Sequence, residues 1–230
     1  MALIIFTLII GLLPSFVWLI FFYKEDLHPE PKKLLVLTFL SGLIAAFLSL
    51  LIEYGLTKLV NTPAIKNYTI LSLLIMAAIE EIVKFFCVFS SINNSPYFDE
   101  PTDAMVYLIT AALGFATFEN LAINFSIISS SSGSFILSEI ISATIFRFIG
   151  ATLLHSLCSA IIGFWWAKGI LRYQPKKFIF YGLVIASLLH AFFNYLILSY
   201  ESIIIYPIIF LSIVTFFVLI DFDKLRRYNQ

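Results

Sequence analysis

The chain has 230 residues, of which 61% are hydrophobic and 17% aromatic, while only 12% are charged. A soluble domain of this length needs more polar surface than such a composition supplies, so a soluble globular protein is excluded. The formal net charge is zero, which gives no basic bias toward a nucleic acid. We expect an all-α, polytopic integral membrane protein whose surroundings are the lipid bilayer.

Seven apolar segments are long enough to cross a bilayer as helices, which takes about 20 residues each. In chain order they cover 2–23, 34–56, 69–92, 103–128, 140–167, 178–200 and 202–220. The break between the last two depends on Glu201. The connections are too short to hold a soluble domain, so residues 1–230 are expected to form one membrane domain. Any chemistry must then take place in or at the membrane.

The distribution of lysine and arginine predicts the orientation of these spans. Ten of them fall in the connections 24–33 and 168–177 and in the C-terminal tail, which share one side if seven helices alternate. The opposite side has only two. Because cytoplasmic loops carry the excess of basic residues, we expect the N-terminus outside and the C-terminus in the cytoplasm.

The third span contains an unusual group of charges, in "AAIEEIVKFF" (77–86). Each charge at the centre of a spanning helix costs about 2.5–3.5 kcal/mol on insertion scales. At about 100° per residue, Lys84 projects between Glu80 and Glu81 one turn later, where it can pair with either. It cannot neutralise both, so one carboxylate needs a further partner. A buried ion pair that only joins two helices is the simpler alternative.

The next three spans also carry polar groups. Glu119 and Asn120 lie within "GFATFENLAINF" (114–125) of the fourth span, and His155 lies in the fifth. His190 and Asn194 share one face of the sixth span at i, i+4. Singly, each is typical of a hydrogen bond between packed helices. Four successive spans with an ionisable group near mid-depth instead predict a shared polar site.

Two kinds of site suit such a set. One is an acid–base site in which a carboxylate takes a proton from water and nearby donors stabilise the oxyanion. The other is a metal site, with Glu119, His155 and His190 as candidate ligands and zinc as the first expectation. Arg147 is expected to counter the glutamate charge or to anchor its span near the outer interface. Glu53 lies near the outer end of the second span, where an interfacial role is expected.

These motifs, in this order, resemble those of the PrsW family of intramembrane proteases, which is related to the type II CAAX prenyl endopeptidases. The chain has EExxK from Glu80 to Lys84, FxxxEN from Phe115 to Asn120, then His155 and HxxxN from His190. The flanking segments "HPEPKK" (28–33) and "DEPTDAMVYLITAALGFATFEN" (99–120) are similar as well. The resemblance extends from about residue 14 to residue 196, with its core motifs within 77–196.

The resemblance implies an endopeptidase that hydrolyses a peptide bond in a membrane-anchored protein of a bacterial cell membrane. Members of the family are linked to regulated proteolysis of anti-sigma factors. The CAAX relatives have FxxxH where this chain has FxxxEN, so their prenylated substrates are not carried over. The residues expected to form the site are Glu80, Glu81, Lys84, Glu119, Asn120, His155, His190 and Asn194.

The roles that we expect follow from these residue types. Either Glu80 or Glu81 is the general base, and Lys84 orients the other. Glu119 is a second acid–base group or a metal ligand. The two histidines and Asn194 polarise the carbonyl, stabilise the oxyanion or bind metal. A metal-free glutamic mechanism, without any cofactor, and one that uses a single divalent metal ion are both open.

Two other classes of function compete with a protease. A proton- or cation-coupled transporter could use the same buried groups as a relay, although the sequence has no inverted repeat and no Gly/Pro-broken helix pair beside the charges. A scaffold held by polar packing would lose stability rather than activity when these residues are changed.

Overall fold

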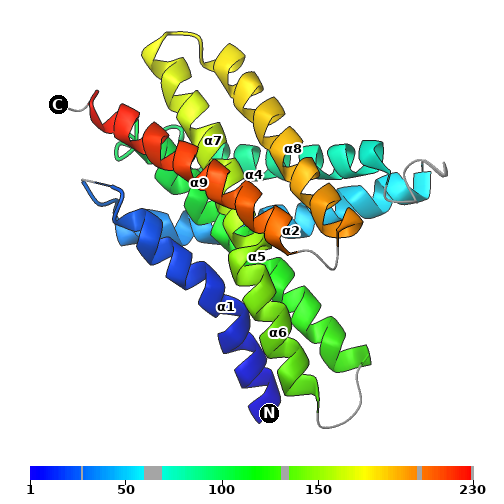
Figure 1. Ribbon diagram of the computed structural model, residues 1–230. Helices are drawn as coiled ribbons and strands as arrows, with labels where there is room; N and C mark the ends of the chain where they lie inside the picture. The colour runs from blue at the N-terminus through cyan, green and yellow to red at the C-terminus, as the bar shows by residue number, and fades with distance from the viewer. Residues whose placement is uncertain (27, 60–68, 131–134, 201–203, 229–230) are drawn as a thin grey trace.

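The computed structural model describes residues 1–26, 28–59, 69–130, 135–200 and 204–228. These residues form α-helices and no strand, which confirms the all-α prediction (Figure 1). The helices are α1 (Ala2–Tyr23), α2 (Lys32–Leu59), α4 (Ile70–Ile92), α5 (Asp103–Ser130), α6 (Ile136–Ile149), α7 (Ala151–Leu171), α8 (Pro175–Ser199) and α9 (Ile205–Arg226).

The predicted spans correspond in order to α1, α2, α4, α5, α6 with α7, α8 and α9. All except α4 are long and apolar enough to cross a membrane, with α6 and α7 counted as one span. Helix α4 has 23 residues, and every 18-residue stretch of it contains the three charged residues Glu80, Glu81 and Lys84. It is therefore not counted among the apolar spans because of its charges. The charged helix nevertheless packs against its apolar neighbours α2, α5, α7 and α8. The predicted break at Glu201 lies outside the described residues.

Helix α5 forms the centre of the molecule. It contacts α1, α2, α4, α6 and α7, and Figure 1 shows it running through the middle of the bundle. Every residue from Asp103 to Thr117 is buried. A helix that is apolar on all sides is expected to be enclosed in this way. Its next turn carries the buried Asn120 and the partly exposed Glu119.

Small residues let α2 and α5 approach closely. A Cβ atom on Gly42 would lie 1.8 Å from the carbonyl oxygen of Ala111, and one on Gly114 would lie 2.0 Å from that of Phe39. Backbone contact of this kind is common between helices in a membrane, because the hydrophobic effect does not drive helices together in lipid. From this crossing both helices continue toward the pocket described below.

The fifth predicted span, 140–167, is a broken helix rather than a continuous one. It consists of α6 and α7, which meet at Gly150 with φ −93° and ψ −98°. Breaks of this sharpness are commonly found at glycine. Arg147 precedes the break and His155 follows it, yet the side chains of both reach Glu119.

Candidate active site

A buried ion pair lies at the centre of the polar cluster. Lys84 Nζ donates to Glu81 Oε1 at 2.7 Å, and both side chains are 0% exposed. The predicted pairing of Lys84 with one of the two glutamates is therefore present, and the partner is Glu81.

Glu81 also holds the histidine of α8. His190 Nδ1 lies 2.8 Å from the same oxygen, Glu81 Oε1. With its proton on Nδ1, a neutral His190 donates to this carboxylate and keeps its lone pair on Nε2. The ring of His190 meets that of His155 edge to face, with centroids 5.0 Å apart.

Glu119 organises a second set of contacts between α5, α6 and α7. Its Oε2 lies 2.9 Å from Arg147 Nη2 and 2.8 Å from His155 Nε2. Arg147 Nε also donates to Asn120 Oδ1 at 2.5 Å, and the amide of Asn120 lies 3.3 Å from Thr152 Oγ1. Arg147 thus counters the glutamate charge, which is one of its two predicted roles.

His155 connects these two sets of contacts. With Nε2 bonded to Glu119, its Nδ1 lies 3.1 Å from Lys84 Nζ. The ring packs against that of Phe115, with centroids 5.1 Å apart. Two carboxylate–histidine pairs, Glu81–His190 and Glu119–His155, therefore lie on either side of one buried lysine.

Glu80 and the two histidines form a group that could hold a metal ion. Glu80 Oε2 lies 3.7 Å from His190 Nε2 and 3.9 Å from His155 Nδ1, and all three atoms are within 4.8 Å of one another. That oxygen is buried without a hydrogen-bond partner among the described residues. Two histidines and a carboxylate are typical ligands of a catalytic zinc ion. Glu80 thus lies with the histidines in place of Glu119, the carboxylate expected as their fellow ligand, and Glu119 is instead paired with Arg147.

Asn194 stands apart from this arrangement. It is half-buried on α8, one turn beyond His190, and its side chain makes no hydrogen bond with the described residues. The structure thus brings together seven of the eight predicted site residues and leaves this one outside their network.

The cluster opens into a pocket of about 200 Å³ between α2, α4 and α5. Glu80 and Glu119 line it together with Ser49 and Glu53 of α2, and its remaining walls are apolar. Glu81 does not reach this pocket. Glu53, expected at an interface, therefore lies beside the site. The i, i+4 spacing of Ser49 and Glu53 in an otherwise apolar segment was the sequence signal for this location.

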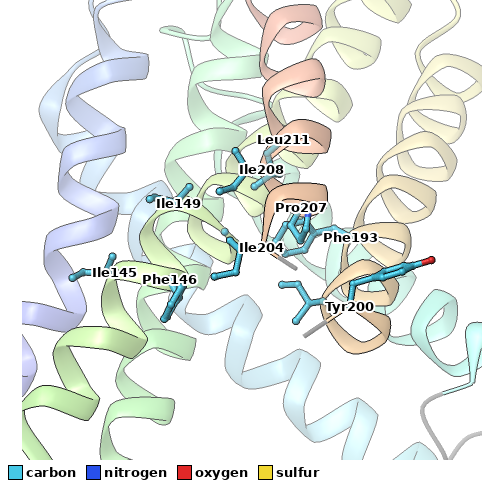
Figure 2. Close-up of a pocket in the computed structure, with 11 residues that line it drawn as sticks. Ile145, Phe146, Ile149, Phe193, Tyr200, Ile204, Pro207, Ile208 and Leu211 are labelled. Atoms are coloured by element: carbon cyan, nitrogen blue, oxygen red, sulfur yellow. The ribbon is translucent and has the colours of Figure 1, made fainter. Parts of the chain in front are cut away.

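A second cavity, of about 450 Å³, lies between α6, α8 and α9 (Figure 2). Its walls are almost entirely apolar, with Phe146, Ile204 and Pro207 around it and Tyr200 at one end. The described residues that line it include no carboxylate, histidine or lysine, so these residues supply no groups for acid–base chemistry or metal binding.

Comparisons with known proteins agree with the geometry. The model of the PrsW family intramembrane metalloproteases matches residues 30–220. Protease PrsW of Geobacillus kaustophilus (strain HTA426) is 28% identical over 195 residues, which cover 83% of this chain and 79% of that protein. Protease PrsW of Bacillus subtilis (strain 168) is 26% identical over 225 residues, covering 96% and 95%. No solved structure matches the chain.

These matches support a peptidase and give no support to the alternative of a transporter. The apolar helices place the chain in a membrane as a multi-pass protein. The chain therefore belongs to the PrsW family of intramembrane metalloproteases, and it is a membrane-embedded protease.

Proposed function

We propose that the protein is a zinc-dependent endopeptidase in which Glu80, His155 and His190 hold the metal ion. The observation that carries this proposal is the buried, unpartnered Oε2 of Glu80 beside a nitrogen of each histidine. An ionised oxygen in such a place needs a cation or a donor. Three protein ligands also leave a fourth position for water, as catalytic zinc requires.

The hydrogen bonds that the two histidines make to carboxylates support the same assignment, in which the metal ion replaces Lys84 Nζ as the partner of His155 Nδ1. Histidines that bind metal usually donate their other ring N–H to a carboxylate, which fixes the tautomer and the ring orientation. Glu81 accepts from His190 at 2.8 Å, and Glu119 lies 2.8 Å from His155 Nε2. Glu81 is buried and bonded to both Lys84 and His190. Its proposed role is therefore to orient His190, without contact with the substrate.

Glu119 is the proposed general base, because it is the other carboxylate that lines the pocket. It takes a proton from water as the water oxygen attacks the scissile carbonyl carbon. It then gives that proton to the leaving nitrogen as the C–N bond breaks, which yields a carboxylic acid and an amine. When bound, zinc supplies a Lewis acid that polarises the carbonyl and favours deprotonation of water. Arg147, 2.9 Å away, keeps Glu119 ionised between turnovers.

The proposed substrate is a membrane-anchored protein that enters the pocket between α2, α4 and α5. An intact helix offers no exposed amides, so the cut segment has to be extended there. A membrane-anchored anti-sigma factor is the first natural substrate to test, because of the family resemblance.

Metal content and cleavage, measured together, test the assignment. Purified variants are placed in liposomes without an ion gradient, with a single-span reporter protein as substrate. Glu80→Gln, His155→Ala and His190→Ala should lose both bound zinc and cleavage. Glu119→Gln should lose cleavage even when zinc is saturating, and it should bind zinc about 10–100-fold more weakly because Glu119 also supports His155. Glu81→Gln should bind zinc about 10–100-fold more weakly, because only the support of His190 is changed.

Two results would contradict this assignment. Full cleavage by a chelator-treated protein that contains no metal would rule out the zinc mechanism. Cleavage by Glu119→Gln at the wild-type rate would show that another group is the base. Restoration of activity when zinc is added back to the chelated protein is the positive control.

A further inference from the structure

Helix α2 presents an unpaired hydroxyl to the pocket. Ser49 is only 2% exposed, and its Oγ has no hydrogen-bond partner among the described residues. A serine in a spanning helix normally bonds back to the carbonyl four residues earlier, as Ser41 does to Leu37 at 2.9 Å. Ser49 is one of the residues that line the pocket, and its Oγ has no bond among the described residues that a bound group would have to break.

One turn later, Glu53 presents an unpaired carboxylate to the same pocket. Its Oε1 is buried without a hydrogen-bond partner, and the carboxylate has no ion pair within the described part of the chain. The two cations of the site are already engaged, Lys84 by Glu81 and Arg147 by Glu119. A carboxylate in apolar surroundings is stable in its charged form only beside a cation.

A cation beside Glu53 is better supplied by a substrate than by a metal ion. Glu53 is not part of the group whose ligand atoms lie close enough to share a metal. The apolar pocket walls around it include Leu50 and Phe118. Such walls suit the aliphatic stem of a lysine or arginine, whose charged end then reaches the carboxylate.

We propose that Ser49 and Glu53 form a substrate-binding edge that selects a basic side chain next to the cut bond. Glu53 pairs with the lysine or arginine, and Ser49 hydrogen-bonds the extended backbone of the same segment. This inference rests on the proposed function, since Glu80 and Glu119 in the same pocket are taken as the groups that act on the bond.

The experiment uses a series of single-span reporters that differ only at the positions flanking the mapped cut, with lysine, glutamine or glutamate at each. Binding of labelled reporter peptides and kcat/KM for the reporters are both measured. At one position, the kcat/KM of wild type should be about tenfold higher for the lysine reporter than for the glutamine reporter. This is the effect expected of a hydrogen bond to a charged group. Glu53→Gln should lose this preference, so that its ratio of kcat/KM for the lysine reporter to that for the glutamine reporter falls to about one.

Charge reversal sharpens the test. Glu53→Arg should favour the glutamate reporter, which a merely structural role of Glu53 would not produce. Ser49→Ala should raise KM for every reporter with little change in kcat. Glu139→Gln, a change to an exposed carboxylate on α6 away from the pocket, is the matched control and should keep the lysine preference.

Several outcomes would overturn the inference. Equal binding of lysine and glutamine peptides by wild type would do so, as would a Glu53→Gln variant that slows all reporters alike. Selective binding of lysine peptides without any cleavage would instead contradict the proposed function and leave the binding edge supported. The two proposals therefore fail by different measurements.

Discussion

Lys84 is the residue on which the polar cluster depends most. Its ammonium lies 2.7 Å from Glu81 Oε1, 3.1 Å from His155 Nδ1 and 4.8 Å from the centre of the Phe115 ring. The side chain is 0% exposed, so water cannot replace any of these contacts. Removal of one partner of a buried pair leaves the other charge uncompensated, which costs more than the pair itself contributes.

We therefore expect Lys84→Met to lower the free energy of unfolding by about 3–5 kcal/mol, because Glu81 would be left as an unpaired buried charge. Unfolding in detergent, followed by circular dichroism, measures this. The double variant Glu81→Gln/Lys84→Met should recover part of the loss.

A matched control exists at the same i, i+3 spacing. Lys224 bonds Asp221 at 2.8 Å, but the lysine side chain is 55% exposed. Lys224→Met should cost only about 0–1 kcal/mol, since exposed pairs are screened by water. If Lys84→Met and Lys224→Met lowered the free energy of unfolding equally, burial of the Lys84–Glu81 pair would make no difference to its contribution.

At the scale of elements, the approach of α2 to α5 sets the shape of the pocket. Both helices line it, α2 with Ser49 and Glu53 and α5 with Glu119. Their separation is set by Gly42 and Gly114, where any Cβ would overlap a backbone carbonyl of the other helix. A backbone clash cannot be relieved by a rotamer change, so the helices would have to move apart.

Gly42→Ala and Gly114→Ala should each destabilise the protein by about 1–3 kcal/mol or more and reduce cleavage, because α2 moves away from Glu80 and Glu119. Unfolding and reporter cleavage are measured on the same preparations. Gly55→Ala is the control, since a Cβ there meets nothing within 4 Å. It should gain about 0.5–1 kcal/mol of stability, as expected for alanine in a helix interior. Stability unchanged in all three variants would contradict this packing.

At the scale of the whole molecule, the connection between α1 and α2 joins distant parts of the chain. Tyr107 of α5 donates its hydroxyl to Glu30, and Arg226 of α9 donates to the backbone carbonyl and the carboxylate of Glu25. Glu30 is 5% exposed and Asp26 is 6% exposed. Burial raises the pKa of both carboxyl groups above their ordinary values.

This predicts a pH dependence of stability. A carboxyl group with a raised pKa in the folded state binds its proton more tightly there than in the unfolded chain. Its contribution is fully present below the unfolded pKa and is lost as the pH rises through the higher folded value. Stability should therefore decrease as the pH rises above about 4.5, the ordinary value for glutamate. Glu30→Gln, which can still accept from Tyr107, should make this decrease smaller.

Denaturation in detergent at a series of pH values measures the slope. Asp26→Asn should reduce it in the same direction. An identical pH profile in wild type and both variants would contradict a role for these two groups.

Much of the site was predictable because its residue types are costly in a membrane. Glu80, Glu81 and Lys84 stand out in α4 for that reason alone, and Glu119 and the histidines stand out in their own spans. Helical periodicity also predicted that Lys84 would pair with one of the two glutamates. It could not tell which, because the choice depends on where His190 of α8 and His155 of α7 approach.

Other features depend on contacts between helices and were not predictable. Glu53 was expected at an interface, Glu119 was preferred to Glu80 beside the histidines, and the break at Gly150 was not expected. Asn194 shares a helix face with His190 and yet stays outside the network. These outcomes depend on the rotation of each helix about its axis and on the angles between helices. The spacing of residues along the chain determines neither of these quantities.

Composition and apolar segments alone were enough to establish a helical membrane protein, because lipid leaves each segment no way to satisfy its backbone except as a helix. That is a local requirement, and every segment meets it separately. The assignment of partners is not local. The packing of α4 against α7 and α8 places an oxygen of Glu80 near two histidine nitrogens, and the close approach of α2 to α5 places Glu53 in the same pocket as Glu119. Glu80 and the two histidines are far apart in the chain, and only the packing of the helices brings their ligand atoms within 4.8 Å of one another. At such distances these groups can share one metal ion.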